Sequence, residues 1–299
     1  MLAKTVECVP NFSVGRDLLL VEKLADCYRG CTGVKLLDYS ADADHNRCVI
    51  TAAGEPQALC KAVFNSIKIA VDNIDLNKHH GGHPRIGAAD VIPFVPLFNM
   101  EMQEVVELSR QLGKLVGEEL RFPVFLYEQS ATSENRMNLA EVRKGGFEGL
   151  ASKLRQSDWQ PDFGPPVPHT SAGACAIGAR KILCAFNVNL RTDDVNIARQ
   201  IAGKVREKNG GLPSCKALGL MLESGQTVQV SMNLTDYTQT GLHQAFEQVC
   251  VEAEKLGVEV ASSELIGLAP LAALNDSLRY YMKLDNLTPG KILDFKLYE

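Results

Sequence analysis

A stretch dense in proline and glycine, residues 157–174, constrains the fold of this 299-residue chain more than any other feature. It reads SDWQPDFGPPVPHTSAGA and contains the chain's only tryptophan, Trp159. Because proline removes a backbone donor and glycine loosens the backbone, no long helix or central strand is expected to run through it. We therefore expect two subdomains, residues 1–178 and 179–299.

Apolar periodicity predicts the order strand, helix, strand, strand, helix, strand in both halves. In the first half these segments are residues 4–9, 18–28, 34–38, 47–53, 56–74 and 89–97. In the second half they are residues 182–190, 195–208, 217–222, 227–234, 242–256 and 258–268. The predicted fold class is α+β, with two α/β subdomains. Each has a mostly antiparallel or mixed sheet with helices on one face (βαββαβ-like), and a ligand cleft lies between them.

Two prolines lie in the last predicted strand of the first half. Pro93 and Pro96 predict that 89–97 is an edge strand or an irregular one.

Charge and cysteine pattern indicate the kinds of partner and the compartment. The net charge of −5 argues against a general nucleic-acid binder. The nine cysteines are scattered without a C-x-x-C pair, and no segment is typical of a leader or a membrane span. We expect a cytoplasmic protein with small-molecule substrates and neither nucleic-acid nor membrane partners.

Three of the chain's six histidines fall within five residues, in the loop NKHHGGHPRIG at residues 77–87. Its glycines and proline break regular structure, so packing alone does not explain so many titratable groups. An imidazole with a pKa near neutrality suits proton transfer, and Pro84 restricts the backbone next to His83. Arg85 or Lys78 could hold a carboxylate. We therefore expect acid–base chemistry at His83.

Metal and nucleotide sites are alternative interpretations of two motifs. His79 and His83 have the spacing of an H-E-x-x-H zinc helix, but the intervening glycines break a helix and no glutamate follows His79. A metal site formed by the loop histidines together with Asp90 remains an alternative. Residues 173–181 fall short of a P-loop, because the lysine is displaced by two positions and no Ser or Thr follows it. We expect a tight turn that leads into a strand there, and no metal.

Several longer motifs occur in one order along the chain. They are ECVPNFS at 7–13, KHHGGHPRIGA at 78–88, WQPDFGP at 159–165, GARK at 178–181 and AFNVNL at 185–190. Together they resemble glutamate formimidoyltransferase, the transferase portion of formimidoyltransferase-cyclodeaminase, from about Thr5 to about Tyr280. The resemblance implies two α/β subdomains with folate between them. It also implies transfer of the formimidoyl group of N-formimidoyl-L-glutamate to N5 of tetrahydrofolate in histidine degradation, and a homodimer.

The resemblance also implies roles for individual residues. The catalytic histidine, which directly precedes Pro-Arg in the family, corresponds to His83. The folate-binding stretch corresponds to Gly164, Pro165, Pro166, Val167, Pro168, His169, Thr170, Ser171, Ala172 and Gly173. We expect tetrahydrofolate as cosubstrate and no metal. The residues expected to support catalysis or substrate binding are Arg85, Lys78, His79, Asp38, Ser40, Asn11 and Arg47.

The chain departs from its relatives at two positions that bear on the histidine. Gly82 and Ser40 stand where relatives often have acidic residues, so Asp38, Asp42 or Asp44 could orient the imidazole instead.

These departures leave open that the protein is a glutamate formyltransferase, which would use N-formyl-L-glutamate. A non-catalytic folate-binding protein and a metal-dependent amidohydrolase are further alternatives. Because the chain ends without a cyclodeaminase domain, we expect another protein to release ammonia from the product.

Overall fold

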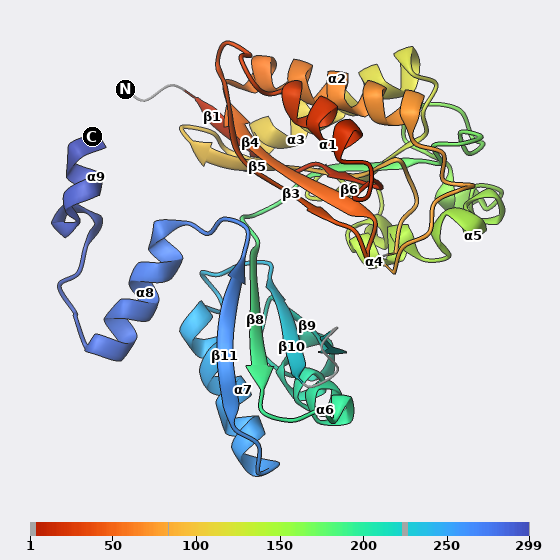
Figure 1. Cartoon of the computed structure of the whole chain (residues 1–299). Coiled ribbons are helices and arrows are strands. Elements are labelled where there is room, and N and C mark those ends of the chain that lie inside the picture. Colours follow the sequence, from red (N-terminus) through yellow and green to blue (C-terminus); the bar gives the residue numbers. More distant parts are fainter. Residues whose placement is uncertain (1–3, 83, 223–226, 299) are drawn as a thin grey trace. The chain divides into compact units, whose positions relative to one another are not determined.

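The computed structural model describes residues 4–82, 84–222 and 227–298 of the chain (Figure 1). It divides into two compact units, Met1–Arg180 and Lys181–Glu299. Each unit has a sheet and an apolar core of its own. The predicted α+β class with two subdomains is confirmed.

The first unit is built on a mixed sheet that has seven strands in the described part of the chain. They are β1 (Thr5–Cys8), β2 (Asn11–Phe12), β3 (Val34–Asp42), β4 (Arg47–Gly54), β5 (Ala89–Phe98), β6 (Val124–Glu128) and β7 (Cys175–Ala179). β5 lies inside the sheet, antiparallel to β1 and β2 and parallel to β7. The prediction of an edge strand was therefore wrong, although the register does shift against β1 and β2. Pro93 is tolerated in the interior because its carbonyl still accepts the Val9 N–H, at 3.1 Å.

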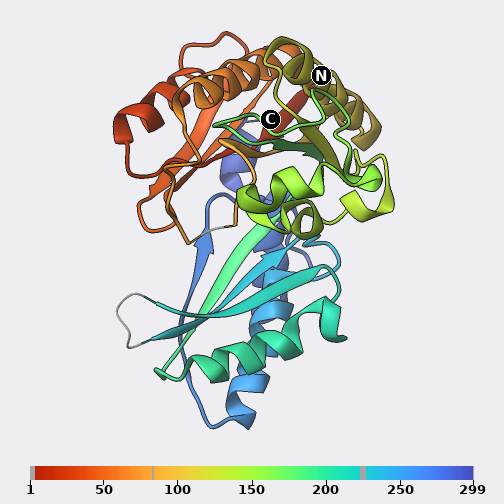
Figure 2. The same ribbon diagram turned by 90° about the vertical axis from the view of Figure 1, so that its right-hand side faces the viewer.

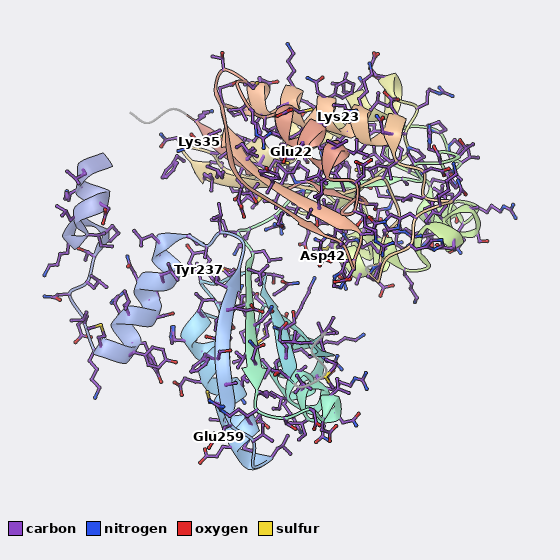
Figure 3. All side chains as sticks on the ribbon, in the orientation of Figure 1. Glu22, Lys23, Lys35, Asp42, Tyr237 and Glu259 are labelled. Carbon is purple, nitrogen blue, oxygen red and sulfur yellow. The ribbon has the colours of Figure 1, made fainter. Side chains whose placement is uncertain are left out.

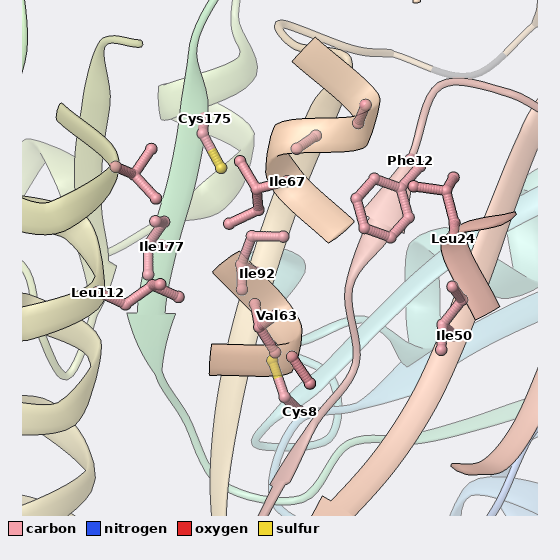
Figure 4. Packing of buried hydrophobic residues seen from close by; sticks show 14 of the residues in the cluster. Cys8, Phe12, Leu24, Ile50, Val63, Ile67, Ile92, Leu112, Cys175 and Ile177 are labelled. Atoms are coloured by element: carbon pink, nitrogen blue, oxygen red, sulfur yellow. The ribbon is translucent and has the colours of Figure 1, made fainter. Parts of the chain in front are cut away.

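Three helices cover one face of this sheet, as Figures 1 and 2 both show. They are α1 (Leu18–Asp26), α2 (Pro56–Asn73) and α3 (Met102–Glu119). Val63 and Ile67 of α2 face Cys8 and Ile92 of the sheet in the main core (Figure 4). Full burial of a side chain such as Ile67 contributes about 1.5–3 kcal/mol. This layer therefore fixes the strands from which the loops of the candidate site extend.

A smaller core lies on the opposite face of the same sheet. It is covered by α4 (Leu139–Arg143) and α5 (Gly146–Lys153). Val142 and Leu150 of these helices pack with Val91 of β5. Successive residues of a strand point to opposite faces, so β5 contributes to both cores. As a result, α4 and α5 lie beside the loop that enters β5.

Strand β7 was not predicted, because residues 173–181 were expected to form a turn that leads into a strand. Instead β7 lies between β5 and β6 and is parallel to both. Gly178 permits this position, since a Cβ there would lie less than 3.0 Å from the carbonyl oxygen of Tyr127. The small residues of this segment thus serve close strand packing.

The second unit has an antiparallel sheet in the order β11-β8-β10-β9. Its elements are β8 (Cys184–Leu190), α6 (Val195–Val205), β9 (Cys215–Met221), β10 (Val228–Leu234), α7 (Leu242–Lys255), β11 (Val260–Ile266), α8 (Leu271–Met282) and α9 (Leu293–Tyr298). Val188 and Val230 pack in one core with residues of α6 and α7. The predicted element order of this half is confirmed. Residues 223–226, between the predicted strands 217–222 and 227–234, lie outside the described residues. Over residues 4–82, 84–222 and 227–298, no helix has the length and apolar character needed to cross a membrane.

Replacing Gly87 by alanine should destabilise the first unit. Gly87 forms a bridge with Gly173, and a Cβ at Gly87 would lie less than 3.0 Å from the carbonyl oxygen of Ala174. Because overpacking typically costs about 1–3 kcal/mol, we expect a loss of at least about 1 kcal/mol in urea unfolding. Gly149→Ala in α5 is the control, since its Cβ would have open space and should be neutral or stabilising. Equal stabilities of the two variants would contradict this packing.

Candidate functional site

A small pocket in the first unit gathers residues from three separate segments of the chain. Its described lining is Asn11, Phe12, Ser13, His45, Asn46, Arg47, His79, Arg85 and Asp90. Four predicted site residues are thereby brought together, namely Asn11, Arg47, His79 and Arg85. The pocket lies where β2, the start of β4 and the histidine loop meet.

Asn46 holds the loop before β4 against the histidine loop. Its carbonyl oxygen accepts a hydrogen bond from Nε2 of His79 at 2.8 Å, and its side-chain amide donates to the carbonyl oxygen of His80 at 3.3 Å. A Cβ on Gly81 would lie less than 3.0 Å from the carbonyl oxygen of His45. A glycine at position 81 is therefore what allows the two backbones to approach so closely.

His79 is a buried imidazole, only 8% exposed. Because its Nε2 donates to a carbonyl, the lone pair lies on Nδ1, which is buried and has no hydrogen-bond partner among the described residues. Burial lowers the pKa of His79, and the positive charge of Arg85 lowers it further. His79 is thus a neutral group that fixes the loop.

Arg47 is a largely buried cation with no ion-pair partner in the described part of the chain. It donates from Nη2 to Oδ1 of Asn11, and its buried Nε has no partner among the same residues. Burial and then the charge of Arg143 lower the pKa of Arg47. A desolvated guanidinium favours an anionic ligand, above all a carboxylate that it can bind through two N–H groups.

Two carboxylates of the site, Asp90 and Glu148, are already paired with other arginines. Asp90, 3% exposed, accepts a hydrogen bond from Arg143 and also accepts the Ile86 N–H at 2.8 Å. Glu148 pairs with Arg85 at 3.0 Å. Asp42, whose charge also acts on Arg47, is hydrogen-bonded to His45. Arg47 is therefore the arginine of this group that has no ion-pair partner among the described residues.

Asp90 had been considered as a metal ligand together with the loop histidines. Both of its oxygens are used, one by Arg143 and the other by the backbone of Ile86. Within the described ranges, no group of three or more His, Cys, Asp or Glu side chains is placed to hold a metal ion.

The remaining predicted site residues do not line the described part of the pocket. Lys78 is exposed and pairs with Asp75 at 3.4 Å. Asp38 and Ser40 are exposed on β3. His83, the predicted catalytic residue, lies outside the described residues.

The predicted folate-binding stretch, residues 164–173, runs beside the histidine loop. The N–H of Leu76 donates to the carbonyl oxygen of Ser171, and the N–H of Ala88 donates to that of Ala172, both at 2.8 Å. The end of the stretch is therefore hydrogen-bonded to residues on both sides of the histidine loop. This arrangement brings the two predicted functional segments together in one unit.

Sequence reasoning missed three residues at or beside the pocket, His45, Asn46 and Arg143. The first two lie between the predicted strands 34–38 and 47–53, and the available signal was the spacing Asp42-x-x-His45. Arg143 gave no such signal, since its contact with Asp90 depends on how α4 packs.

The chain matches known proteins along nearly all of its length. Residues 5–180 match the N-terminal subdomain of the formiminotransferase domain, and residues 185–291 match the formiminotransferase domain. A glutamate formimidoyltransferase of Streptococcus pyogenes serotype M1 is 48% identical over 95% of this chain and 95% of its own. One of Thermoplasma acidophilum is 46% identical over 98% of this chain and 97% of its own. A formimidoyltransferase-cyclodeaminase of Dictyostelium discoideum is 42% identical over 95% of this chain and 54% of its own.

His79 should contribute to a loss of stability as the pH falls below about 6.5, the usual histidine pKa. Because the folded-state pKa is lowered, the unfolded chain binds a proton before the folded protein does. The contribution of His79 to the free energy of unfolding is therefore complete above the pKa of the unfolded chain. It is lost as the pH falls through the lower pKa of the folded protein. His79→Gln keeps an N–H donor for Asn46, so in urea unfolding it should lose less stability than the wild type between about pH 7 and pH 5.5. An unchanged pH dependence would show that His79 is not responsible.

Proposed function

The chain belongs to the formiminotransferase family, and we propose that it transfers the formimidoyl group of N-formimidoyl-L-glutamate to N5 of tetrahydrofolate. The products are 5-formimidoyltetrahydrofolate and L-glutamate, a step of histidine degradation. The observation that carries the proposal is the partly buried Arg47 guanidinium. It has no carboxylate partner among the described residues, and it lies in the same pocket as His79 and Arg85. The donor brings two carboxylates, and Arg47 is suited to bind one of them.

We assign the proton transfers to His83. The N5 amine attacks the amidine carbon and forms a new C–N bond in a tetrahedral intermediate. A proton then leaves N5, another reaches the glutamate nitrogen, and the old C–N bond breaks. One imidazole can act first as base and then as acid, so the proton that it takes from N5 is matched by the proton that it gives to the glutamate nitrogen. Neither a covalent enzyme intermediate nor a metal is part of this proposal.

The other residues bind or orient the substrates in this scheme. Arg47 and Arg85 would hold the carboxylates of the donor, and Asn11 would orient Arg47. Residues 164–173 would bind folate, beside the loop that carries His83. The exposed residues Lys78, Asp38 and Ser40 are candidates for the outer parts of the substrates. A cytoplasmic location and a homodimer, which the family resemblance implies, belong to the same proposal.

A formyl donor is the second candidate, because the described pocket lacks an available negative charge. The formimidoyl group is cationic when protonated, and a carboxylate would stabilise it. Asp90 is the one carboxylate among the described lining residues, and it is bound to Arg143. A neutral formyl group would need no such partner.

The two donors and the metal-dependent alternative can be separated in one assay. The chain, treated with a chelator, is incubated with tetrahydrofolate and either N-formimidoyl- or N-formyl-L-glutamate, and the folate product is followed by absorbance. We expect transfer from the formimidoyl donor only, with no loss of rate in the chelator. Transfer from the formyl donor alone would favour the second candidate. Donor consumption without folate, or inhibition by the chelator, would favour the amidohydrolase.

Replacing His83 by alanine should lower kcat by about a hundredfold or more, because general acid–base help is lost. His80→Asn is the matched control, since His80 is an exposed histidine in the same loop and should keep nearly full activity. Both variants are first checked for unchanged urea unfolding. A His83→Ala variant with wild-type kcat would exclude the assigned mechanism.

A further inference from the structure

A buried ion pair lies directly before the predicted folate-binding stretch. Nη1 of Arg136 is 2.6 Å from Oδ2 of Asp162, and the two side chains are 7% and 8% exposed. Asp162 is the one acidic residue of the motif WQPDFGP at 159–165. A buried pair is sensitive to the loss of either partner, because the remaining charge is left uncompensated. The pair is therefore a specific contact close to the point where the stretch begins.

Asp162 binds to β6, the strand at one edge of the sheet. Its Oδ2 atom accepts the N–H of Leu126 at 2.7 Å, and its Oδ1 atom accepts a hydrogen bond from the hydroxyl of Thr132. Its main-chain N–H donates to the carbonyl oxygen of Val124 at 2.8 Å, and the N–H of Val124 donates to that of Phe163 at 2.9 Å. Side chain and backbone together thus continue the hydrogen bonding of the sheet as far as Phe163.

The Arg136 guanidinium binds further points of the same segment. Its Nη2 atom donates to the carbonyl oxygens of Asp158 and Gln160. Its Cζ atom lies 5.6 Å from the centre of the Phe125 ring in β6, within the range of a cation–π contact. A planar guanidinium can make several directed hydrogen bonds at once, whereas an ammonium group is a point charge. Arg136 therefore connects residues 158–162 with β6 through one side chain.

Gly164, the first residue of the stretch, has no space for a side chain. Its backbone has φ +83°, a conformation that favours glycine, and a Cβ there would lie 2.7 Å from the carbonyl oxygen of Phe122. A Cβ on Gly117 of α3 would lie 2.6 Å from the backbone nitrogen of Gly164. The position of Gly164 is thus set by close contacts with the backbone before β6 and with α3. The residues that follow, Pro166 and Val167, are exposed.

The other end of the exposed segment is anchored by a separate set of hydrogen bonds. The N–H of His169 donates to the carbonyl oxygen of Gly173 at 2.9 Å, and the reverse hydrogen bond is 3.0 Å long. Residues 164–168 therefore form a loop with two fixed ends, and Arg136 and Asp162 fix the first of them. A loop that is ordered before its ligand arrives loses less conformational entropy on binding.

We propose that Arg136 and Asp162 are positioning residues for tetrahydrofolate, and this inference rests on the proposed function, which assigns residues 164–173 to folate binding. The ion pair holds residues 164–168 in the conformation that contacts the ligand, so that the loop loses little freedom when tetrahydrofolate binds. The pair acts through the backbone of the loop and not on the reacting atoms. Its loss should therefore weaken tetrahydrofolate binding and leave the chemical step unchanged.

Asp162→Asn and Arg136→Gln test this role in the full chain. Each variant should raise KM for tetrahydrofolate by about tenfold, because part of the binding free energy is then used to order the loop. KM for N-formimidoyl-L-glutamate and kcat at saturating folate should be nearly unchanged. The double variant should raise KM no further than the more affected single variant, because the two groups act as a unit. Thr132→Val removes only the hydroxyl that donates to Asp162, so this milder change should raise KM by about two- to threefold.

Two controls separate this effect from a general loss of stability. Glu22→Gln removes the carboxylate of another arginine pair, in which Nη1 of Arg29 is 2.7 Å from Oε2 of Glu22 on α1 (Figure 3). Glu22 also accepts a hydrogen bond from Tyr39 of β3, which lies at the opposite edge of the sheet from β6. Val21→Ala, on the buried face of the same helix, lowers the free energy of unfolding. Both controls should keep the wild-type KM for tetrahydrofolate, and urea unfolding shows whether each variant is folded.

Calorimetry with tetrahydrofolate alone gives a measurement that does not depend on transfer. A Kd raised by about tenfold in Asp162→Asn and Arg136→Gln, with wild-type values in Glu22→Gln and Val21→Ala, supports the inference. Wild-type KM and Kd in both pair variants would overturn it, as would a loss of kcat at unchanged KM or an equal rise of KM in the controls. A wild type that binds tetrahydrofolate without transferring the formimidoyl group would overturn the proposed function alone. A wild type that does not bind tetrahydrofolate would overturn both.

Discussion

The close backbone contact between Gly81 and His45 is the constraint on which the rest of the site depends. Any side chain at position 81 would separate the loop before β4 from the histidine loop. The hydrogen bond from His79 to Asn46 then fixes the same two segments in register. Arg47 follows directly in sequence, so its position beside His79 is a consequence of this contact. Gly81 is thus needed for assembly of the pocket.

The distribution of charge explains how an acidic chain can bind anionic substrates. The net charge is −5, yet the pocket contains Arg47, a guanidinium that has no ion-pair partner among the described residues. An unpaired charge in a desolvated place is costly unless a ligand supplies its partner. Arg47 is such a group, whereas Arg85 and Arg143 are already paired with Glu148 and Asp90. A dicarboxylate donor therefore complements the pocket where the chain itself does not.

Much of the fold could be predicted from sequence because it depends on short-range periodicity. Helix α2 and the order of the second half follow from apolar spacing within single segments. β7 could not be predicted, since its small residues give no strand signal and its place between β5 and β6 is set by tertiary pairing. The interior position of β5 was missed because its prolines indicated an edge strand. Pro93 is tolerated inside the sheet, where only its carbonyl oxygen is used as a hydrogen-bond acceptor.

The candidate site was predictable only where a motif carried it. The family motifs indicated His83, Arg85 and Asn11, whereas the contact of Arg143 with Asp90 depends on how α4 packs on the sheet. His45 was missed because Asp-x-x-His spacing is common in polar turns. Its proximity to Gly82 becomes visible only when two loops that are far apart in sequence are brought together.

The central claim is that the partly buried Arg47 binds a carboxylate of the donor. Its most direct test is the affinity for N-formimidoyl-L-glutamate, measured by calorimetry on the wild type and on Arg47→Met and Lys114→Met, after unfolding has confirmed that all three are folded. A charge-assisted hydrogen bond contributes about 1.5–3 kcal/mol, so Arg47→Met should bind at least about tenfold more weakly. Lys114→Met, which removes an exposed cation of α3, should bind nearly as well as the wild type. Equal affinities of Arg47→Met and the wild type would contradict the account.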